Sequence, residues 1–192
     1  MKIVRRFQAG LRAVAIAGLA FTVLSAPAVA HDDRNDATVR VMTRNLYIGS
    51  TAAAVTGAAS FPALVAGAAQ VYQEVAATKP AERAAAVARD IARNNVDLVG
   101  LQEAGLIRKG PLQLPPNPAT FLPATTVVSD QLQLILDELD RLGERYEVVA
   151  IVPGFDAQLP TTLEHDARLT TRIAIIARTG RSSDLKLSNV QV

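Results

Sequence analysis

The sequence predicts an α/β fold in which helices cover a sheet. Two observations predict this class: strand-like and helix-like segments alternate along the chain, and residues 96–103, VDLVGLQE, form a nearly uninterrupted apolar run typical of a strand buried on both faces. The 192 residues correspond to one domain. Because the chain has no cysteine, a disulfide scaffold, a thiol nucleophile, a zinc–thiolate site and an iron–sulfur cluster are all excluded.

Residues 1–30 have the three parts of a secretory signal peptide. A basic stretch is followed by the apolar run Ala13–Ala26, and Ala28 and Ala30 stand where small residues precede a cleavage point. The alternative is an uncleaved transmembrane anchor, which needs roughly 20 consecutive apolar residues. The run has only 14. We therefore expect cleavage after Ala30, a secreted or periplasmic protein without a transmembrane anchor, and a flexible lead-in over residues 31–37.

The positive charge of the chain is concentrated in that signal segment. Residues 1–30 hold four of the 20 Lys and Arg residues and none of the 18 acidic residues, which leaves 16 basic and 18 acidic groups in the remainder. The mature chain therefore has a net charge of −2. This charge gives no support for non-specific binding to nucleic acid.

The first half of the mature chain predicts a strand, a helical region, a second helix and a second strand. Residues 38–47 alternate apolar and polar side chains and predict the first strand. Residues 52–77 are Ala-rich and predict a helical region that glycine and proline residues interrupt. Pro80 suits the first turn of a helix whose apolar residues recur at helical spacing until Asn94. The run VDLVGLQE is the strand that follows.

A long segment and a helix come next. Residues 104–128 contain five prolines and little periodicity, so we expect an extended loop of the length that is often functional. Ser129 is a favourable N-cap for a helix that ends at Gly143.

The last part of the chain predicts three strands. Residues 146–152 and 169–178 have strand patterns and are separated by a predicted loop over residues 153–167. Residues 180–184 predict a turn, and residues 185–192 predict a final strand with alternating apolar positions.

Two polar residues stand where a ligand site is expected. Asn45 and Glu103 each end a predicted strand, and open α/β sheets bind ligands at the carboxyl ends of their strands. The helix between these strands provides the crossover that parallel strands need, so both side chains should lie at one edge of the sheet, roughly 4–8 Å apart if a cation and a phosphate bridge them. Arg172 should lie at that edge or one strand away. The alternative for Glu103 is a solvated side chain.

Two motifs carry a resemblance to a known family. MTRNLYIG at residues 42–49 and DLVGLQE at residues 97–103, with a helix between them, resemble the opening of the endonuclease/exonuclease/phosphatase superfamily. This is the metal-dependent phosphodiesterase fold of pancreatic deoxyribonuclease, exonuclease III and bacterial sphingomyelinases. The likeness covers residues 38–192. It implies a portion of a four-layer α/β-sandwich with mixed sheets.

The resemblance implies roles for three residues. Glu103 would be the ligand of Mg²⁺, with Mn²⁺ as the alternative ion, and Asn45 would help to hold the metal, the scissile phosphate or the attacking water. Arg172 would contact the phosphate; its alternative is an edge-strand arginine that faces water. The metal would stabilise the charge that develops on the phosphate.

The second half of the family pattern is absent from the sequence. Family members carry a Gly-Asp-x-Asn segment and a terminal Ser-Asp-His segment, and neither occurs here. The two histidines do not replace them, because His31 would be the first mature residue and His165 lies too early in the chain, as a solvated loop residue. We therefore expect a C-terminally incomplete domain with little or no hydrolytic activity. Its uncovered sheet face predicts association.

Two function classes follow. The first is an exported, Mg²⁺-dependent phosphoesterase that hydrolyses phosphodiesters or phosphomonoesters. The alternative is a truncated, non-catalytic remnant or binding module of the same fold. A periplasmic solute-binding protein is a third class, but the length is small for two lobes. Nucleic acid and phospholipid both stay open as the phosphate-ester substrate, with the net charge weakly against nucleic acid.

Overall fold

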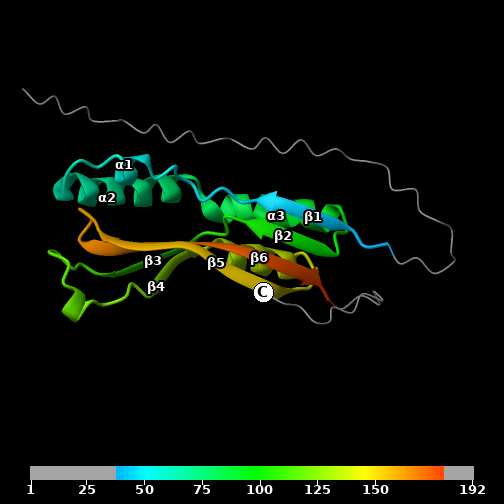
Figure 1. The fold of residues 1–192 in the computed structure, drawn as a ribbon. Helices are drawn as coiled ribbons and strands as arrows, with labels where there is room; N and C mark the ends of the chain where they lie inside the picture. The colour runs from blue at the N-terminus through cyan, green and yellow to red at the C-terminus, as the bar shows by residue number, and fades with distance from the viewer. Residues whose placement is uncertain (1–37, 180–192) are drawn as a thin grey trace, which may run out of the picture. The chain divides into compact units, whose positions relative to one another are not determined.

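The computed structural model describes residues 38–179. The predicted signal peptide, the lead-in over 31–37, the turn over 180–184 and the strand over 185–192 lie outside these residues. The described elements are β1 (Val41–Asn45), α1 (Ala53–Thr56), α2 (Phe61–Ala77), α3 (Pro80–Arg93), β2 (Leu98–Gln102), β3 (Leu106–Pro111), the 3-10 helix η1 (Pro118–Thr120), β4 (Thr126–Asp130), α4 (Gln131–Arg141), β5 (Tyr146–Pro160) and β6 (His165–Arg178) (Figure 1).

The strands form one mixed six-stranded sheet, which confirms the α/β class. β1 and β2 are parallel, and the helices between them provide the predicted crossover. The pairs β2–β6, β3–β6, β3–β4 and β5–β6 are antiparallel. None of the described helices is long and apolar enough to span a bilayer.

β6 organises the sheet. One of its edges pairs with β5 over almost the full length of both strands. Since a strand has only two edges, β2 and β3 share the other edge: β2 pairs with the end near Ala174 and β3 with the start near His165. β6 therefore connects the two halves of the domain.

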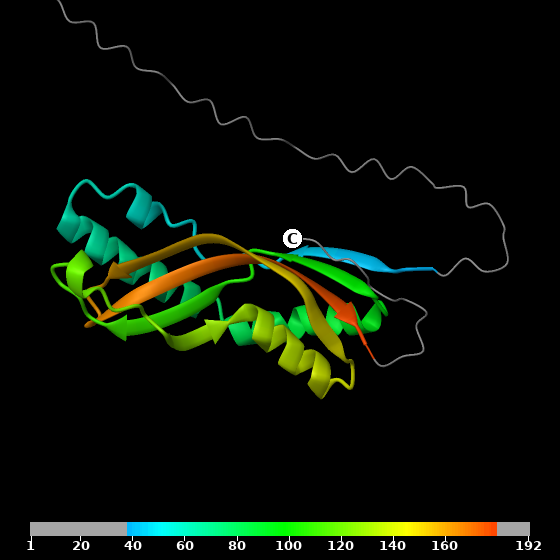
Figure 2. The same cartoon turned by 60° about the horizontal axis from the view of Figure 1, so that its bottom comes forward.

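The hydrophobic core lies on one face of this sheet, which we call the covered face. α3 and α4 lie side by side along it, whereas α1 and α2 lie at the other end of the sheet (Figure 2). The apolar stripe predicted for α3 faces the core, where Ile91 is fully buried. The strands supply Val99, Leu101, Ala174 and Ile176 to the same core, and each is at most 1% exposed.

The opposite face, which we call the open face, is covered by α2 near Ile107 and Leu169 but has exposed apolar side chains elsewhere. Val41 is 69% exposed, Ile173 is 53% exposed and Ile175 is 40% exposed. The prediction that β2 is buried on both faces is therefore wrong: only Val99 and Leu101 are buried, and their neighbours along the strand are partly exposed. The reason is that α3 and α4 both lie on the covered face. Association through the open face stays a prediction.

The long loop predicted over residues 104–128 is wrong in part. β3 and β4 form an antiparallel pair within it. Both strands have weak periodicity, and β3 forms because its backbone adds to the free part of the β6 edge. The prolines lie at the end of β3 or in the connection to β4, where no ladder hydrogen bond is needed.

The loop predicted over residues 153–167 is also mostly strand. β5 continues to Pro160 and β6 begins at His165, so only residues 161–164 connect them. The register shifts between Val148 and Ala150 and between Pro153 and Asp156. These irregularities let the strand pass Pro153 and Gly154 without losing its partner.

α4 begins one residue later than predicted. Its N-cap is Asp130, whose Oδ1 accepts hydrogen bonds from the backbone N–H groups of Leu132 at 3.0 Å and Gln133 at 3.2 Å. Ser129 belongs to β4, paired with Ile107. The prediction of Ser129 as the cap is wrong, because β4 continues through Asp130 and the Asp130 carboxylate then accepts from the first N–H groups of the helix.

The interrupted helical region is two helices. Gly57 ends α1, and Pro62 lies in the first turn of α2, where its missing N–H costs nothing. Gly67 faces α1 so closely that a Cβ atom there would lie 2.3 Å from the Ala54 carbonyl oxygen. Each residue that interrupts the pattern therefore has a place in a helix pair.

Candidate functional site

Asn45 and Glu103 meet at one edge of the sheet. β1 and β2 run parallel, and Asn45 pairs with Gln102, the residue before Glu103. The Asn45 Nδ2 atom donates a hydrogen bond of 2.8 Å to Glu103 Oε1. The expectation that the two side chains share an edge is confirmed. They touch directly, so the expected spacing of roughly 4–8 Å with a cation between them is wrong, and a cation would lie beside the pair.

The chain after β1 completes the arrangement. The Ile48 N–H donates to Glu103 Oε2 at 3.1 Å, and the Tyr47 N–H donates to Asn45 Oδ1 at 2.8 Å. Tyr47 and Glu103 both have left-handed backbone, with φ of 52° and 54°. Such conformations are uncommon for residues other than glycine and cluster at functional positions. The backbone is thus strained at the residue that bears the carboxylate and at the residue directly before the Ile48 donor.

Neutral groups hold the Glu103 carboxylate. Its hydrogen-bond donors are a side-chain amide and a backbone N–H, and no Lys or Arg within residues 38–179 forms an ion pair with it. Each oxygen keeps a free lone pair, because a carboxylate accepts about four hydrogen bonds. The side chain is half-buried, while Asn45 is exposed. The site therefore presents an orientated negative charge that no neighbouring cation neutralises.

The donor set suits a hard cation held mainly by water. Within the described part of the chain, no three His, Cys, Asp or Glu residues are grouped closely enough to hold a metal ion between them. A cage made wholly of side chains is therefore excluded there. Mg²⁺ is commonly bound by one or two carboxylates and keeps several waters, so Glu103 as ligand and Asn45 as its orienting partner fit Mg²⁺ or Mn²⁺.

Arg172 lies one strand away but points elsewhere. Residues two apart in a strand share a face, so Arg172 lies on the covered face together with the core residues Ala174 and Ile176. Its guanidinium donates to both Asp130 oxygens, at 3.1 Å to Oδ2, and its Nε donates to the Ala104 carbonyl at 3.1 Å. The structure therefore does not bring it to the Asn45–Glu103 pair. The alternative of a water-facing edge arginine is wrong too, because the side chain is 11% exposed in an inner strand.

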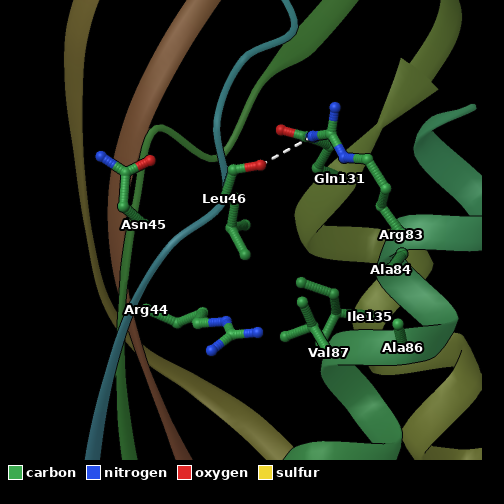
Figure 3. A pocket seen from close by; sticks show the side chains of 9 residues that line it. All are labelled: Arg44, Asn45, Leu46, Arg83, Ala84, Ala86, Val87, Gln131 and Ile135. Atoms are coloured by element: carbon green, nitrogen blue, oxygen red, sulfur yellow. Dashed lines mark hydrogen bonds between the residues drawn. The ribbon is translucent and has the colours of Figure 1, made fainter. Parts of the chain in front are cut away.

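A cavity of about 220 Å³ lies behind β1, against α3 and α4. Apolar side chains of Leu46, Val87 and Ile135 line its inner part, and Arg44 and Arg83 lie around them (Figure 3). Figure 3 shows the Asn45 amide directed away from the helices, although Asn45 also borders the cavity. The cavity and the Asn45–Glu103 pair therefore occupy opposite sides of the end of β1.

Two residues that the sequence analysis missed support the site from behind. The Arg83 guanidinium donates to the Leu46 carbonyl at 2.7 Å and to the Tyr47 carbonyl, and it lies over the Tyr47 ring. Gln131 accepts from the Gly105 N–H at 2.8 Å and donates to the Tyr47 carbonyl at 3.5 Å. Arg83 holds the backbone after Asn45, and Gln131 connects that segment to the backbone after Glu103. No local signal marks them, because each contact joins segments that are far apart in the sequence.

The histidines do not join the site. His31 lies outside the described residues. His165 is half-buried at the start of β6, with its Nδ1 atom 2.8 Å from the Leu163 carbonyl and its ring 5.0 Å from that of Tyr72. The prediction of a solvated loop residue is wrong, because β6 begins earlier than its pattern indicates. The prediction that His165 does not replace a catalytic histidine agrees with this position.

Comparison with known proteins adds no relative. No family model, no curated protein and no solved structure matches the chain. The resemblance to the endonuclease/exonuclease/phosphatase superfamily therefore stays a prediction that rests on the two motifs.

Proposed function

We propose that this chain is an exported phosphoesterase domain that binds Mg²⁺ at Glu103 and takes phosphate esters beside it. The observation that carries the proposal is the Glu103 carboxylate, which Asn45 and the Ile48 N–H hold without a counter-charge. The inner carboxylates Asp130 and Asp156 each have an arginine partner, and Asp166, which neutral groups also hold, is only 2% exposed. Glu103 combines the lack of a counter-charge with a half-buried side chain that a ligand can reach. Export rests on the pattern of residues 1–30.

The residues have distinct tasks in this proposal. Glu103 would hold the metal through its free lone pairs, and Asn45 would fix the orientation of the carboxylate. When bound, Mg²⁺ supplies charge stabilisation to a phosphate under attack. Arg83 and Gln131 keep the surrounding backbone in place and are positioning residues. Arg172 has no part in the site as the structure arranges it.

The substrate class is a phosphodiester or a phosphomonoester. Selectivity among phosphate esters resides in loops around such a site. The segment nearest to Glu103 is the Tyr47–Gly49 turn, in which the exposed Tyr47 ring offers a flat apolar surface under the Arg83 guanidinium. Nucleic acid and phospholipid both stay open as the source of the ester.

A second candidate is a binding module that holds the metal and the ester without turnover. The observation that favours it is that, within residues 38–179, no histidine is hydrogen-bonded to Glu103 and no three His, Cys, Asp or Glu residues form a group that could hold a metal ion. A general base needs to lie within hydrogen-bond reach of the attacking water.

Titration of the chain with Mg²⁺ by calorimetry tests both candidates. We expect saturable binding that weakens at least tenfold in Glu103→Gln, because the neutral amide removes the anionic ligand. Glu147→Gln is the matched control, since Glu147 is exposed on β5. Binding together with Mg²⁺-dependent hydrolysis of bis(p-nitrophenyl) phosphate supports the enzyme, and binding without hydrolysis supports the module. Equal binding by Glu103→Gln, or no binding at all, contradicts both.

A further inference from the structure

A second polar cluster lies on the covered face of β6, beyond the N-terminus of α4. It contains three arginines and only two aspartates, so two of the arginines share one carboxylate. Arg168 donates to Asp156, with its Nε 2.9 Å from Oδ1, and Arg172 donates to Asp130 at 3.1 Å. These two ion pairs leave the third arginine, Arg108, between them.

Arg108 shares its carboxylate partner, Asp156, with Arg168. It stands opposite Arg168 in the β3–β6 register, and its guanidinium donates to the Thr170 hydroxyl between Arg168 and Arg172. Its nearest carboxylate oxygen, Asp156 Oδ1, is 3.5 Å away and already accepts from Arg168 and from Thr170. The buried Nε atom of Arg108 has no hydrogen-bond partner. The cluster thus has three guanidinium groups and only two carboxylates.

The next carboxylate along this face, that of Asp166, does not add a third negative charge partner for the three arginines. Asp166 is 2% exposed and accepts hydrogen bonds from the Gln113 and Gln158 side chains, both neutral, and from the Gln113 N–H. It forms no ion pair with an arginine of residues 38–179.

The arrangement is unfavourable for an empty site. Burial lowers the pKa of Arg108, and the nearby Arg168 and Arg172 charges lower it further, against the opposing effect of Asp156 and Asp130. A guanidinium stays charged in proteins, so this environment costs stability instead of removing the charge. An anion that entered beside Arg108 would offset that cost.

We propose that Arg108 is the centre of an oxyanion-binding site that takes a phosphoryl group, either as inorganic phosphate or as the terminal group of a monoester. The guanidinium presents donors in a planar fork that matches phosphate oxygens, and its side chain is 16% exposed, so part of it is open to solvent. Arg168 and Arg172 flank it and add to the positive field. The site is separate from Glu103 and does not depend on the proposed metal.

Binding of inorganic phosphate to the full chain tests the proposal. The measurement is calorimetry at constant ionic strength, without Mg²⁺. We expect saturable binding that weakens at least tenfold in Arg108→Gln and remains unchanged in Arg145→Gln, a control at an exposed arginine. Glu103→Gln should also bind phosphate normally, which separates this site from the proposed metal site. Absence of saturable binding, or equal binding by Arg108→Gln, overturns the proposal.

Thermal unfolding without phosphate gives an independent test. If Arg108 is retained for an anion, Arg108→Gln leaves the unfolding midpoint unchanged or raises it, because Asp156 keeps Arg168 and Thr170. A midpoint lowered by several degrees shows a structural cation and overturns the proposal. Arg108→Lys keeps the charge but loses the fork, and it should bind phosphate more weakly than the natural chain. Equal affinity for phenyl phosphate and phosphate identifies a terminal phosphoryl group as the ligand, whereas binding of phosphate alone identifies the free ion; both outcomes support the site.

Discussion

Glu103 and Asp156 are carboxylates of one sheet with opposite surroundings. Asp156 accepts from the Arg168 guanidinium and from Thr170, and these contacts lower its pKa to about 2. Glu103 accepts only from an amide and a backbone N–H. A carboxylate beside arginines has its charge compensated within the fold. Glu103 is held by neutral donors and, unlike the buried Asp166, is partly exposed, so its charge is available to a ligand. This difference separates the structural region from the proposed site.

Arg172 pairs with Asp130 and therefore belongs to the structural region, in which arginines compensate the carboxylates. Arg172→Met leaves Asp130 without its cation and the Ala104 carbonyl without its donor, so we expect the free energy of unfolding to fall by about 2–4 kcal/mol. Urea unfolding monitored by circular dichroism measures this loss, with Arg145→Met as the exposed control. Mg²⁺ affinity should stay within about twofold of the natural chain while the variant is folded, because Arg172 does not touch Glu103. Normal stability with loss of Mg²⁺ or ester binding would place Arg172 in the site after all.

We expect the Asp156 carboxylate to contribute to stability in a way that acid removes. Its folded pKa of about 2 lies below the ordinary value of 3.8, so its contribution is fully present above about pH 4 and is lost as the pH falls toward 2. We expect Asp156→Asn to lower the free energy of unfolding by about 1–2 kcal/mol at pH 7, a value reduced because the side chain is one-third exposed. The difference from the natural chain should shrink between pH 4 and pH 2.

Urea unfolding at a series of pH values measures that difference, and Asp140→Asn on the exposed side of α4 is the control. A difference that stays constant down to pH 2 would show that Asp156 contributes through packing and not through its charge.

Of these substitutions, we expect Glu103→Gln to change stability the least. In Glu103→Gln the side-chain oxygen still accepts from Asn45 but the Ile48 N–H loses its acceptor, so we expect the free energy of unfolding to fall by about 1 kcal/mol even though Mg²⁺ binding is lost. Chemical unfolding without metal measures it. A loss as large as that of Arg172→Met would show that Glu103 stabilises the fold and would remove the contrast between the two regions.

The sequence predicted the elements in which apolar residues follow a clear pattern, namely α3, α4 and β2. It also predicted the edge where Asn45 and Glu103 meet, since two parallel strands joined by a helical crossover end at the same edge. It did not predict β3, β4 or the full length of β5 and β6. Those segments have weak patterns and become strands because a neighbouring backbone is available.

By itself, then, the sequence determined which faces are apolar and which residue types end the strands. Only the tertiary structure decided the partners: Asp130 and not Ser129 caps α4, Asp130 also pairs with Arg172, Arg83 reaches the backbone after Asn45, and Arg108 shares Asp156 with Arg168. The physical reason is that periodicity reports local burial, whereas a charge partner is selected among all groups that the completed sheet brings within about 4 Å. The role proposed for Glu103 depends on that selection, because no Lys or Arg of residues 38–179 forms an ion pair with it.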